Sequence, residues 1–316
     1  MVLRQSSCIR RIVEKTTGPL WADSRLAEPV PMALIAIGIR HRAGQHSLAA
    51  MLETLHVATL RTLFANKGKQ AMKGLLTIGN PKTEKGNGLG YLTAILHLAP
   101  ATLAGVGNLC PWASPGCIAG CLNTAGRGGI IRRGETTNAI QQARIRRTRW
   151  FRSNRDGFVA RLRKEIAAHV RRAQRHGLQP AVRLNGTSDL PWERLAPELF
   201  AEFPDVRFYD YTKAPHRMRE QRQPGWPANY SLTFSRSETN EHDAVAVLRG
   251  GGNVAVVFRD GLPDTWNGAP VVNGDAHDLR FLDPVGGFVV GLKAKGKARR
   301  DTSGFVVASQ SLTLAG

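Results

Sequence analysis

Hydrophobic and polar residues follow two different periods between about Leu75 and Val307. Short runs rich in β-branched and aromatic residues alternate with longer runs whose apolar residues recur every three or four positions. This is the pattern of parallel strands joined by crossover helices. The short runs predict six strands, which are Tyr91–Leu98, Ala181–Leu184, Val206–Tyr209, Tyr230–Phe234, Val254–Phe258 and Phe288–Leu292. Six strands are too few to close an eight-stranded barrel, so the pattern predicts an α/β fold with an open, partial βα barrel.

The helical runs predict two long helices and three shorter ones. The second long helix has the clearest pattern, because Phe158, Leu162 and Ile166 fall four positions apart and Gly177 ends the run. The predicted helices are Glu135–Arg152, Arg155–His176, Trp192–Glu202, His216–Arg222 and Glu241–Arg249. Together with the strands they predict one βα domain over residues 71–316.

Residues 1–70 have a different pattern from the rest of the chain. They begin with scattered Arg and Ser, contain Pro29 and Pro31, and then offer one amphipathic helix at Ser47–Ala65. Nothing in this stretch is typical of a chemical site, and Cys8 stands alone there. We interpret residues 1–70 as a weakly packed or helical appendage, and a specific binding arm is the alternative.

The charge balance of the chain favours a polyanionic partner. Lys and Arg number 44 against 24 Asp and Glu, which leaves a net charge of +20. The segment Arg127–Arg175 alone holds about fifteen basic residues against three acidic ones. Its long side chains can follow the phosphates of a nucleic acid, or they can form a solvated helix face without a partner. Charge therefore predicts a nucleic acid or nucleotide partner, and a chain that is merely basic is the alternative.

No apolar stretch reaches the roughly 18 residues that a membrane span requires, and the best one, Met32–Ile39, ends at Arg40. No small-residue cleavage pattern typical of a signal peptide follows it. The sequence therefore predicts a cytoplasmic protein with no membrane partner. In that compartment cysteines are more often thiols or metal ligands than disulfides.

Three of the four cysteines lie within twelve residues, at Cys110, Cys117 and Cys121. The loop that holds them contains several glycines and two prolines, and small residues let the chain fold back so that sulfurs meet around one centre. Three thiolates with an open fourth position suit a four-iron, four-sulfur cluster, or a zinc ion completed by His or water. Three small buried cysteines without a metal are the alternative. We predict a metal site, with an iron–sulfur cluster as the first choice.

Polar clusters follow successive predicted strands. The carboxyl ends of strands in βα architectures converge on one rim, so these clusters are expected to line one cavity with the cysteine loop. For any single cluster, ordinary helix caps and turns are the alternative. We predict catalytic roles for Asp189, Asp210 and Lys213, and contacts to cofactor and substrate for Asn185, Ser188, Ser235 and Arg236. After the last strand, Lys293 and Lys295 are predicted to bind an anion such as a phosphate, with a flexible basic loop as the alternative.

The position of the cysteine loop resembles that of the cluster loop in radical S-adenosylmethionine barrels, because it follows the first clear strand on the same rim. In that family three cysteines hold three irons, and the fourth iron binds the amine and carboxylate of the cofactor. The usual spacing there is three residues and then two between cysteines, whereas here it is six and then three.

Several motifs resemble the gene product 88 family of phage proteins, over about Leu75–Val307. The runs that carry the resemblance are Leu76–Lys82, His97–Pro100, Cys110–Gly129, Arg183–Asp189, Phe208–Lys213, Leu232–Glu238, Gly291–Lys297 and Asp301–Gly304. A more distant similarity is to the phage family named for gene products 37 and 68, which is regarded as radical-SAM-like. That family also has a loop of clustered cysteines with Ser-Pro-Gly-Cys and a strand that ends in Thr-Lys-x-Pro, here Thr212–Pro215.

These resemblances imply a phage or prophage protein that acts in a bacterial host cell. The distant similarity implies an ancestry shared with the radical SAM barrels. Together with the basic charge, it leads to the first hypothesis, an iron–sulfur enzyme that acts on a nucleotide or nucleic acid, with S-adenosylmethionine as the candidate cofactor. The alternative hypothesis is a metal-stabilised nucleic-acid-binding protein without catalysis, for which zinc is the expected metal.

Overall fold

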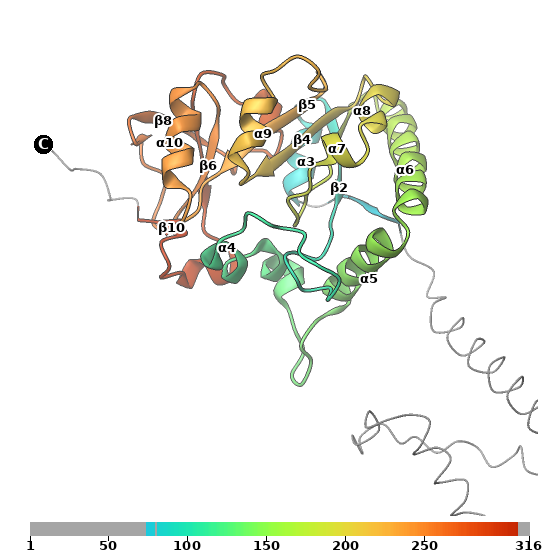
Figure 1. Ribbon diagram of the computed structural model, residues 1–316, viewed down its shortest axis with the longest axis horizontal. Helices are drawn as coiled ribbons and strands as arrows, with labels where there is room; N and C mark the ends of the chain where they lie inside the picture. The colour runs from blue at the N-terminus through green and yellow to red at the C-terminus, as the bar shows by residue number, and fades with distance from the viewer. Residues whose placement is uncertain (1–73, 80, 309–316) are drawn as a thin grey trace, which may run out of the picture. The chain divides into compact units, whose positions relative to one another are not determined.

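The computed structural model describes residues 74–79 and 81–308, which form an α/β fold around one open sheet (Figure 1). Within these residues the sheet has ten strands, in the order β1-β2-β3-β4-β5-β6-β9-β8-β7, with β10 paired to β6. The strands are β1 Leu76–Ile78, β2 Tyr91–Leu96, β3 Gln179–Arg183, β4 Arg207–Thr212, β5 Tyr230–Ser235, β6 Val254–Phe258, β7 Thr265–Trp266, β8 Ala269–Asn273, β9 Val289–Lys293 and β10 Val306–Val307. All six predicted strands are present, and the α/β class is confirmed.

The strands from β2 to β6, followed by β9 and β8, run parallel to their neighbours. An antiparallel strand lies at each end, since β1 pairs with β2 and β7 pairs with β8. The sheet therefore does not close on itself. The short β10 continues the edge of β6 beyond the point where β5 stops, because Val306 pairs with Val257 while β5 reaches only Ala255. This pairing brings the C-terminal part of the domain back to the carboxyl ends of the strands.

The helices that connect the parallel strands lie around the outer side of the sheet, and α4 and the cysteine loop lie at one end of it (Figure 1). The α-helices are α3 Pro81–Asn87, α4 Pro115–Ala119, α5 Ala139–Ser153, α6 Arg155–Arg175, α7 Trp192–Leu195, α8 Glu198–Glu202, α9 Pro215–Glu220 and α10 Glu241–Arg249. Short 3-10 turns are η3 Leu122–Thr124, η4 Gly126–Gly129, η5 Arg280–Leu282 and η6 Gly296–Arg300. The predicted stripe on α6 is buried in the main core, where Phe158, Leu162 and Ile166 are fully inaccessible.

Two predicted helices differ from the structure for local reasons. Helix α5 begins at Ala139 because the side chain of Asn138 accepts hydrogen bonds from the amides of Ile140 and Gln141 and so caps the helix. The predicted helix Trp192–Glu202 is instead two short helices, α7 and α8, separated at Ala196 and Pro197. Proline cannot donate the amide hydrogen bond that a continuous helix needs there.

The predicted appendage, residues 1–70, lies outside the described residues, as does Cys8. Among residues 74–79 and 81–308, no helix has both the length and the apolar character that crossing a membrane requires.

Candidate functional site

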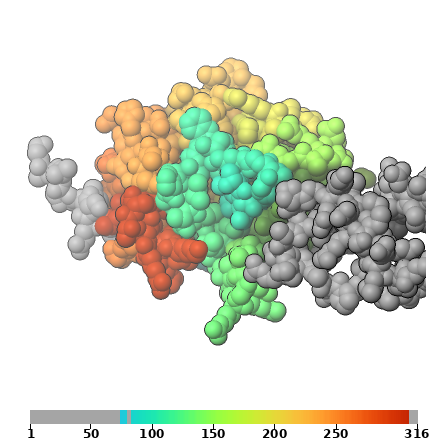
Figure 2. Space-filling view, turned by 60° about the horizontal axis from the view of Figure 1, so that its bottom comes forward, coloured from blue at the N-terminus to red at the C-terminus, as the bar shows by residue number. Residues whose placement is uncertain are grey.

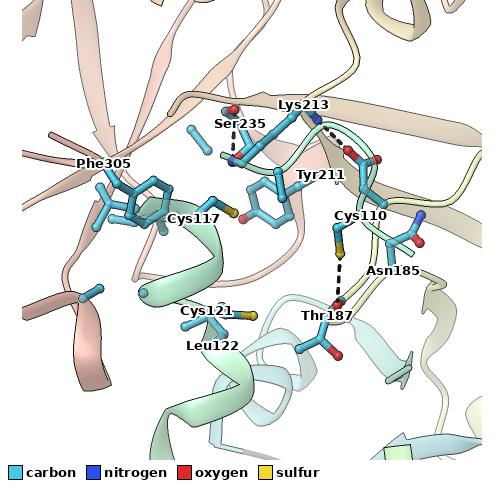
Figure 3. Close-up of a pocket in the computed structure, with 18 of the residues that line it drawn as sticks. Cys110, Cys117, Cys121, Leu122, Asn185, Thr187, Tyr211, Lys213, Ser235 and Phe305 are labelled. Atoms are coloured by element: carbon cyan, nitrogen blue, oxygen red, sulfur yellow. Dashed lines mark hydrogen bonds between the residues drawn. The ribbon is translucent and has the colours of Figure 1, made fainter. Parts of the chain in front are cut away.

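The cysteine loop and the carboxyl ends of the parallel strands enclose a cavity of about 220 Å³, which we name the cysteine cavity (Figure 3). The loops after β3 and β4 and the ends of β5 and β9 form the wall opposite the cysteines. Of the twelve predicted site residues, ten line it, namely Cys110, Cys117, Cys121, Asn185, Ser188, Asp189, Lys213, Ser235, Lys293 and Lys295. This placement agrees with the expectation from the sequence. Polar residues after successive strands lie on the same rim as the cysteines.

The three cysteines point their sulfur atoms into the cysteine cavity (Figure 3). The Sγ of Cys110 accepts a hydrogen bond from the Ala101 amide at 3.3 Å and lies 3.7 Å from the carbonyl oxygen of Thr187. Cys117 lies on α4, and the Sγ of Cys121 accepts from the Asn123 amide at 3.5 Å. The thiols of Cys110 and Cys121 thus accept hydrogen bonds from nearby backbone amides, and all three thiols face a common space.

Helix α4 is held in place by Glu238, which follows β5. One carboxylate oxygen of Glu238 accepts from the Gly116 amide at 2.6 Å, and the other accepts from the Ser114 hydroxyl at 2.7 Å. A Cβ at Gly116 would lie 2.1 Å from the Ser303 hydroxyl, so only glycine fits between α4 and the segment before β10. Cys117 therefore owes its position to parts of the chain more than a hundred residues away.

Burial raises the pKa of all three thiols, to about 12 for Cys110. For Cys117 the nearby Lys213 ammonium opposes part of this rise. Without a bound cation the thiols are therefore neutral at physiological pH. Binding a metal would release their protons, because thiolate is the ligand form.

Three thiols that face one cavity are a donor set that fits an iron–sulfur cluster, whose irons are held by thiolates. Among the described residues, no group of three or more His, Cys, Asp or Glu side chains is arranged to hold one metal ion. The cysteines of a four-iron cluster each bind a different iron, so their sulfurs lie further apart than the ligands of a zinc ion. Two buried polar atoms of the opposite wall, the Tyr211 hydroxyl and Arg183 Nε, have no hydrogen-bond partner among the described residues. A bound group in the cavity can supply such partners.

Lys213 is a buried cation beside Cys117, with 7% of its surface exposed. Its ammonium group donates to the Ser235 hydroxyl at 2.7 Å and to the Ser235 carbonyl at 3.2 Å, and it lies 5.5 Å from the centre of the Phe305 ring. These partners are all neutral. The positive charge of Lys213 is thus available to a negatively charged group in the cavity.

Asp189 also lines the cavity, but its carboxylate is already engaged. It accepts from the Lys213 backbone amide at 2.8 Å and from Arg217 at 3.0 Å. These contacts make Asp189 an anchor for the chain around Lys213. The predicted role of Asp189 in catalysis stays a prediction.

Asp210 lies in a different place from the one expected, since β4 continues through it to Thr212 and buries it completely. Its carboxylate accepts from the backbone amide of Asn185 at 2.7 Å, from the side-chain amide of Asn185 at 3.1 Å and from the Tyr230 hydroxyl at 3.0 Å. Asp210 is not part of the cavity lining. It positions Asn185, which does line the cavity.

Arg236 also lies outside the cavity lining. Its guanidinium pairs with Glu241 and donates to the carbonyls of Gly304 and Phe305, so it ties the start of α10 to the segment before β10. Lys295 lines the cavity but forms an ion pair with Asp275, which also accepts from the Lys293 amide. Lys293 is also exposed at this edge, and it forms no ion pair with another described residue.

Sequence reasoning assigned no role to several residues of the cavity wall, among them Arg183, Tyr211 and Phe305. The guanidinium of Arg183 stacks on the Tyr211 ring at 4.6 Å, and both line the cavity. Phe305 reaches the wall from the segment before β10. A charged residue inside the apolar run of β3 was the one available signal for Arg183. Phe305 had no signal, since a two-residue strand has no detectable period.

Asp210 gives the domain a pH-dependent stability. Burial raises its pKa to about 7, although the Arg183 charge and the Asn185 and Tyr230 hydrogen bonds oppose part of the rise. The folded state then binds more protons than the unfolded state between about pH 4 and pH 7. The free energy of unfolding of the wild type, relative to Asp210→Asn, is therefore expected to fall as pH rises through this window, which urea denaturation at several pH values measures. A difference that grows with pH would instead show that the hydrogen bonds outweigh burial.

The chain was compared with protein families, curated proteins and solved structures. No curated protein and no solved structure matches it. The model of one family, described as gene product 88, matches residues 69–309, which are most of the chain and include every residue of the cysteine cavity. The chain therefore belongs to the gene product 88 family.

Proposed function

We propose that this protein is an iron–sulfur protein, and that Cys110, Cys117 and Cys121 hold a four-iron, four-sulfur cluster in the cysteine cavity. The observation that carries the proposal is that the sulfurs of these three cysteines face one cavity at the carboxyl ends of parallel strands. In βα folds this rim is where cofactors and substrates bind. Three protein ligands leave one iron without a thiolate, as expected for a cluster that binds a further ligand.

We further propose that the protein is a radical-SAM-like enzyme that acts on a nucleotide or nucleic acid. Such a cluster supplies one electron for reductive cleavage of S-adenosylmethionine. The open sheet with consecutive parallel strands supports a partial βα barrel, and the net charge of +20 supports a polyanionic substrate. Lys213 is placed to balance thiolate charge or to bind a carboxylate or phosphate group, and Asn185 and Ser188 present polar side chains to the same space.

The test is anaerobic purification and reconstitution, with analysis of iron and sulfide. We expect about four irons per chain and a brown protein with a broad absorption shoulder. After reduction, an electron paramagnetic resonance signal should appear, and S-adenosylmethionine should alter it if the cofactor binds the open iron. A colourless protein without iron would remove the iron–sulfur proposal. An iron signal that S-adenosylmethionine leaves unchanged would remove only the radical-SAM-like part.

A zinc protein would favour the second candidate, a metal-stabilised nucleic-acid-binding protein without catalysis. The basic segment that begins at Arg127, directly after the cysteine loop, supports this candidate. Stoichiometric zinc in place of iron, with no effect of S-adenosylmethionine on thermal stability, would select it.

A further inference from the structure

Exposed apolar side chains concentrate around the cysteine loop. Of ten large apolar residues exposed in the described part of the chain, seven lie between residues 103 and 140. Among them, Trp112 is 49% exposed, Leu122 52% and Ile130 70%. Figure 2 shows this segment, in teal to light green, spread over one face of the domain with a projection at its edge. Single exposed apolar residues are ordinary, but a concentration of them next to a cavity marks an interaction site.

The projection, residues 130–137, is a basic finger. Its tip is a tight turn, in which the Glu135 amide donates to the Arg132 carbonyl at 3.0 Å and Gly134 adopts a positive φ of 86°. Its base is pinned by Asn138, whose side-chain amide donates to the carbonyls of Arg127 and Ile130, each at 2.9 Å. The finger is therefore held away from the domain by its own hydrogen bonds.

The arginines of the finger face solvent, and the acidic residue of the finger, Glu135, forms no ion pair with them. Arg132 and Arg133 at the tip and Arg127 at the base are exposed, and none of them forms an ion pair with another described residue. Exposed guanidinium groups without an ion pair attract an anion with several charges, such as a chain of phosphates.

Trp112 offers a flat apolar surface near the same cavity. It follows Cys110 by two residues, and its ring lies 5.5 Å from that of His216, which belongs to α9. The contact fixes the indole while half of it stays open to solvent. Exposed aromatic rings combined with arginines are typical of proteins that bind single-stranded nucleic acid, because each base has a face that can stack.

We propose that the face formed by residues 103–140 binds single-stranded nucleic acid, with Arg127, Arg132 and Arg133 on the phosphates and Trp112 stacked on a base. The inference deepens the proposed function, since it names the substrate class and its path to the cysteine cavity. Binding by itself needs no metal. Exposed arginines on the same segment as an exposed aromatic ring fit a nucleic acid, whereas a lipid surface requires a continuous apolar face.

The test is fluorescence anisotropy of a labelled 20-nucleotide single-stranded DNA with the full chain, at several salt concentrations. The double variant Arg132→Ala with Arg133→Ala is expected to bind about tenfold more weakly at low salt and to lower the salt slope by about 1.4, at about 0.7 per phosphate contact. Trp112→Ala is expected to weaken binding about 5- to 150-fold without changing the salt slope, because it removes stacking and no charge.

The matched control is Arg207→Ala with Arg249→Ala, which removes the same charge. Arg207 is the first residue of β4 and Arg249 is the last residue of α10. Both are exposed, and neither lines the cysteine cavity. We expect this control to bind within about twofold of the wild type, since it leaves the contacts intact. Equal losses in both double variants, or no binding at all, would overturn the proposal. The proposal would also be overturned if the protein bound phosphatidylglycerol vesicles through the finger and did not bind DNA. Iron analysis of each sample separates this outcome from failure of the iron–sulfur proposal.

Discussion

Replacing Cys110, Cys117 or Cys121 with serine should abolish stable iron binding in the anaerobically reconstituted protein. Iron is expected to fall from about four per chain to a trace, because a hydroxyl does not replace a thiolate as a ligand of an iron–sulfur cluster. The visible absorption should disappear with it. All three variants should still fold, because serine is close to cysteine in size and shape, and at positions 110 and 121 it can accept the same amide hydrogen bonds.

Cys8→Ser is the matched control for these three variants. Cys8 is the fourth cysteine of the chain and lies outside the cysteine loop, so its loss should leave iron content and absorption unchanged. Circular dichroism of each variant checks that its fold is retained. Full iron in any one of the three loop variants would show that the residue is no ligand.

The sequence was sufficient to place most of the candidate site, because local and global signals agree there. Asn185, Ser188 and Ser235 each come after an apolar run, and consecutive parallel strands bring the residues at their carboxyl ends to one rim. The cysteine loop comes after the first parallel strand and must reach the same rim. Both inferences follow from the order of the strands along the chain, without knowledge of contacts between residues distant in sequence.

Asp210 and Arg236 show where such reasoning fails. Aspartate is rare inside strands, so the strand was predicted to end at Tyr209, yet β4 runs on to Thr212. The strand tolerates Asp210 because Asn185 and Tyr230, which are remote in sequence, donate hydrogen bonds to it. The partners of Arg236 at Gly304 and Phe305 come close only because β10 pairs with β6.

The same limit explains the shortest strands that were missed. A run of two or three residues, such as β1, β7 or β10, has no measurable alternation. Its pairing depends on which edge of the finished sheet is free. Phe305, next to β10, lines the cysteine cavity for this reason alone. The sequence could therefore predict the layers of the fold and the rim of the site, but not the segment that completes its wall.

Arg217→Met should strongly destabilise the domain, because it removes the cation from the buried network that Arg217 forms with Glu193, Asp189 and Tyr230. Arg217 is 2% exposed and makes two hydrogen bonds to Glu193, at 2.8 and 2.7 Å. It also donates to Asp189 at 3.0 Å and to the Tyr230 hydroxyl at 3.1 Å. Removing it leaves two carboxylates with little exposure and no cation, which costs about 3–5 kcal/mol in the free energy of unfolding. Urea denaturation monitored by tryptophan fluorescence measures the change.

Arg219→Met is the control, since Arg219 lies two residues further along α9 and is exposed. Its effect is expected to stay within about 0.5 kcal/mol, as for most surface substitutions. The Arg217 variant should also regain part of its stability at low pH, where protonation neutralises the stranded carboxylates. The iron content of the Arg217 variant should fall as well, because Arg217 holds Asp189 and Asp189 in turn anchors the Lys213 amide. A loss below about 1 kcal/mol would mean that water replaces the guanidinium, and that the wall opposite the cysteines does not depend on this buried network.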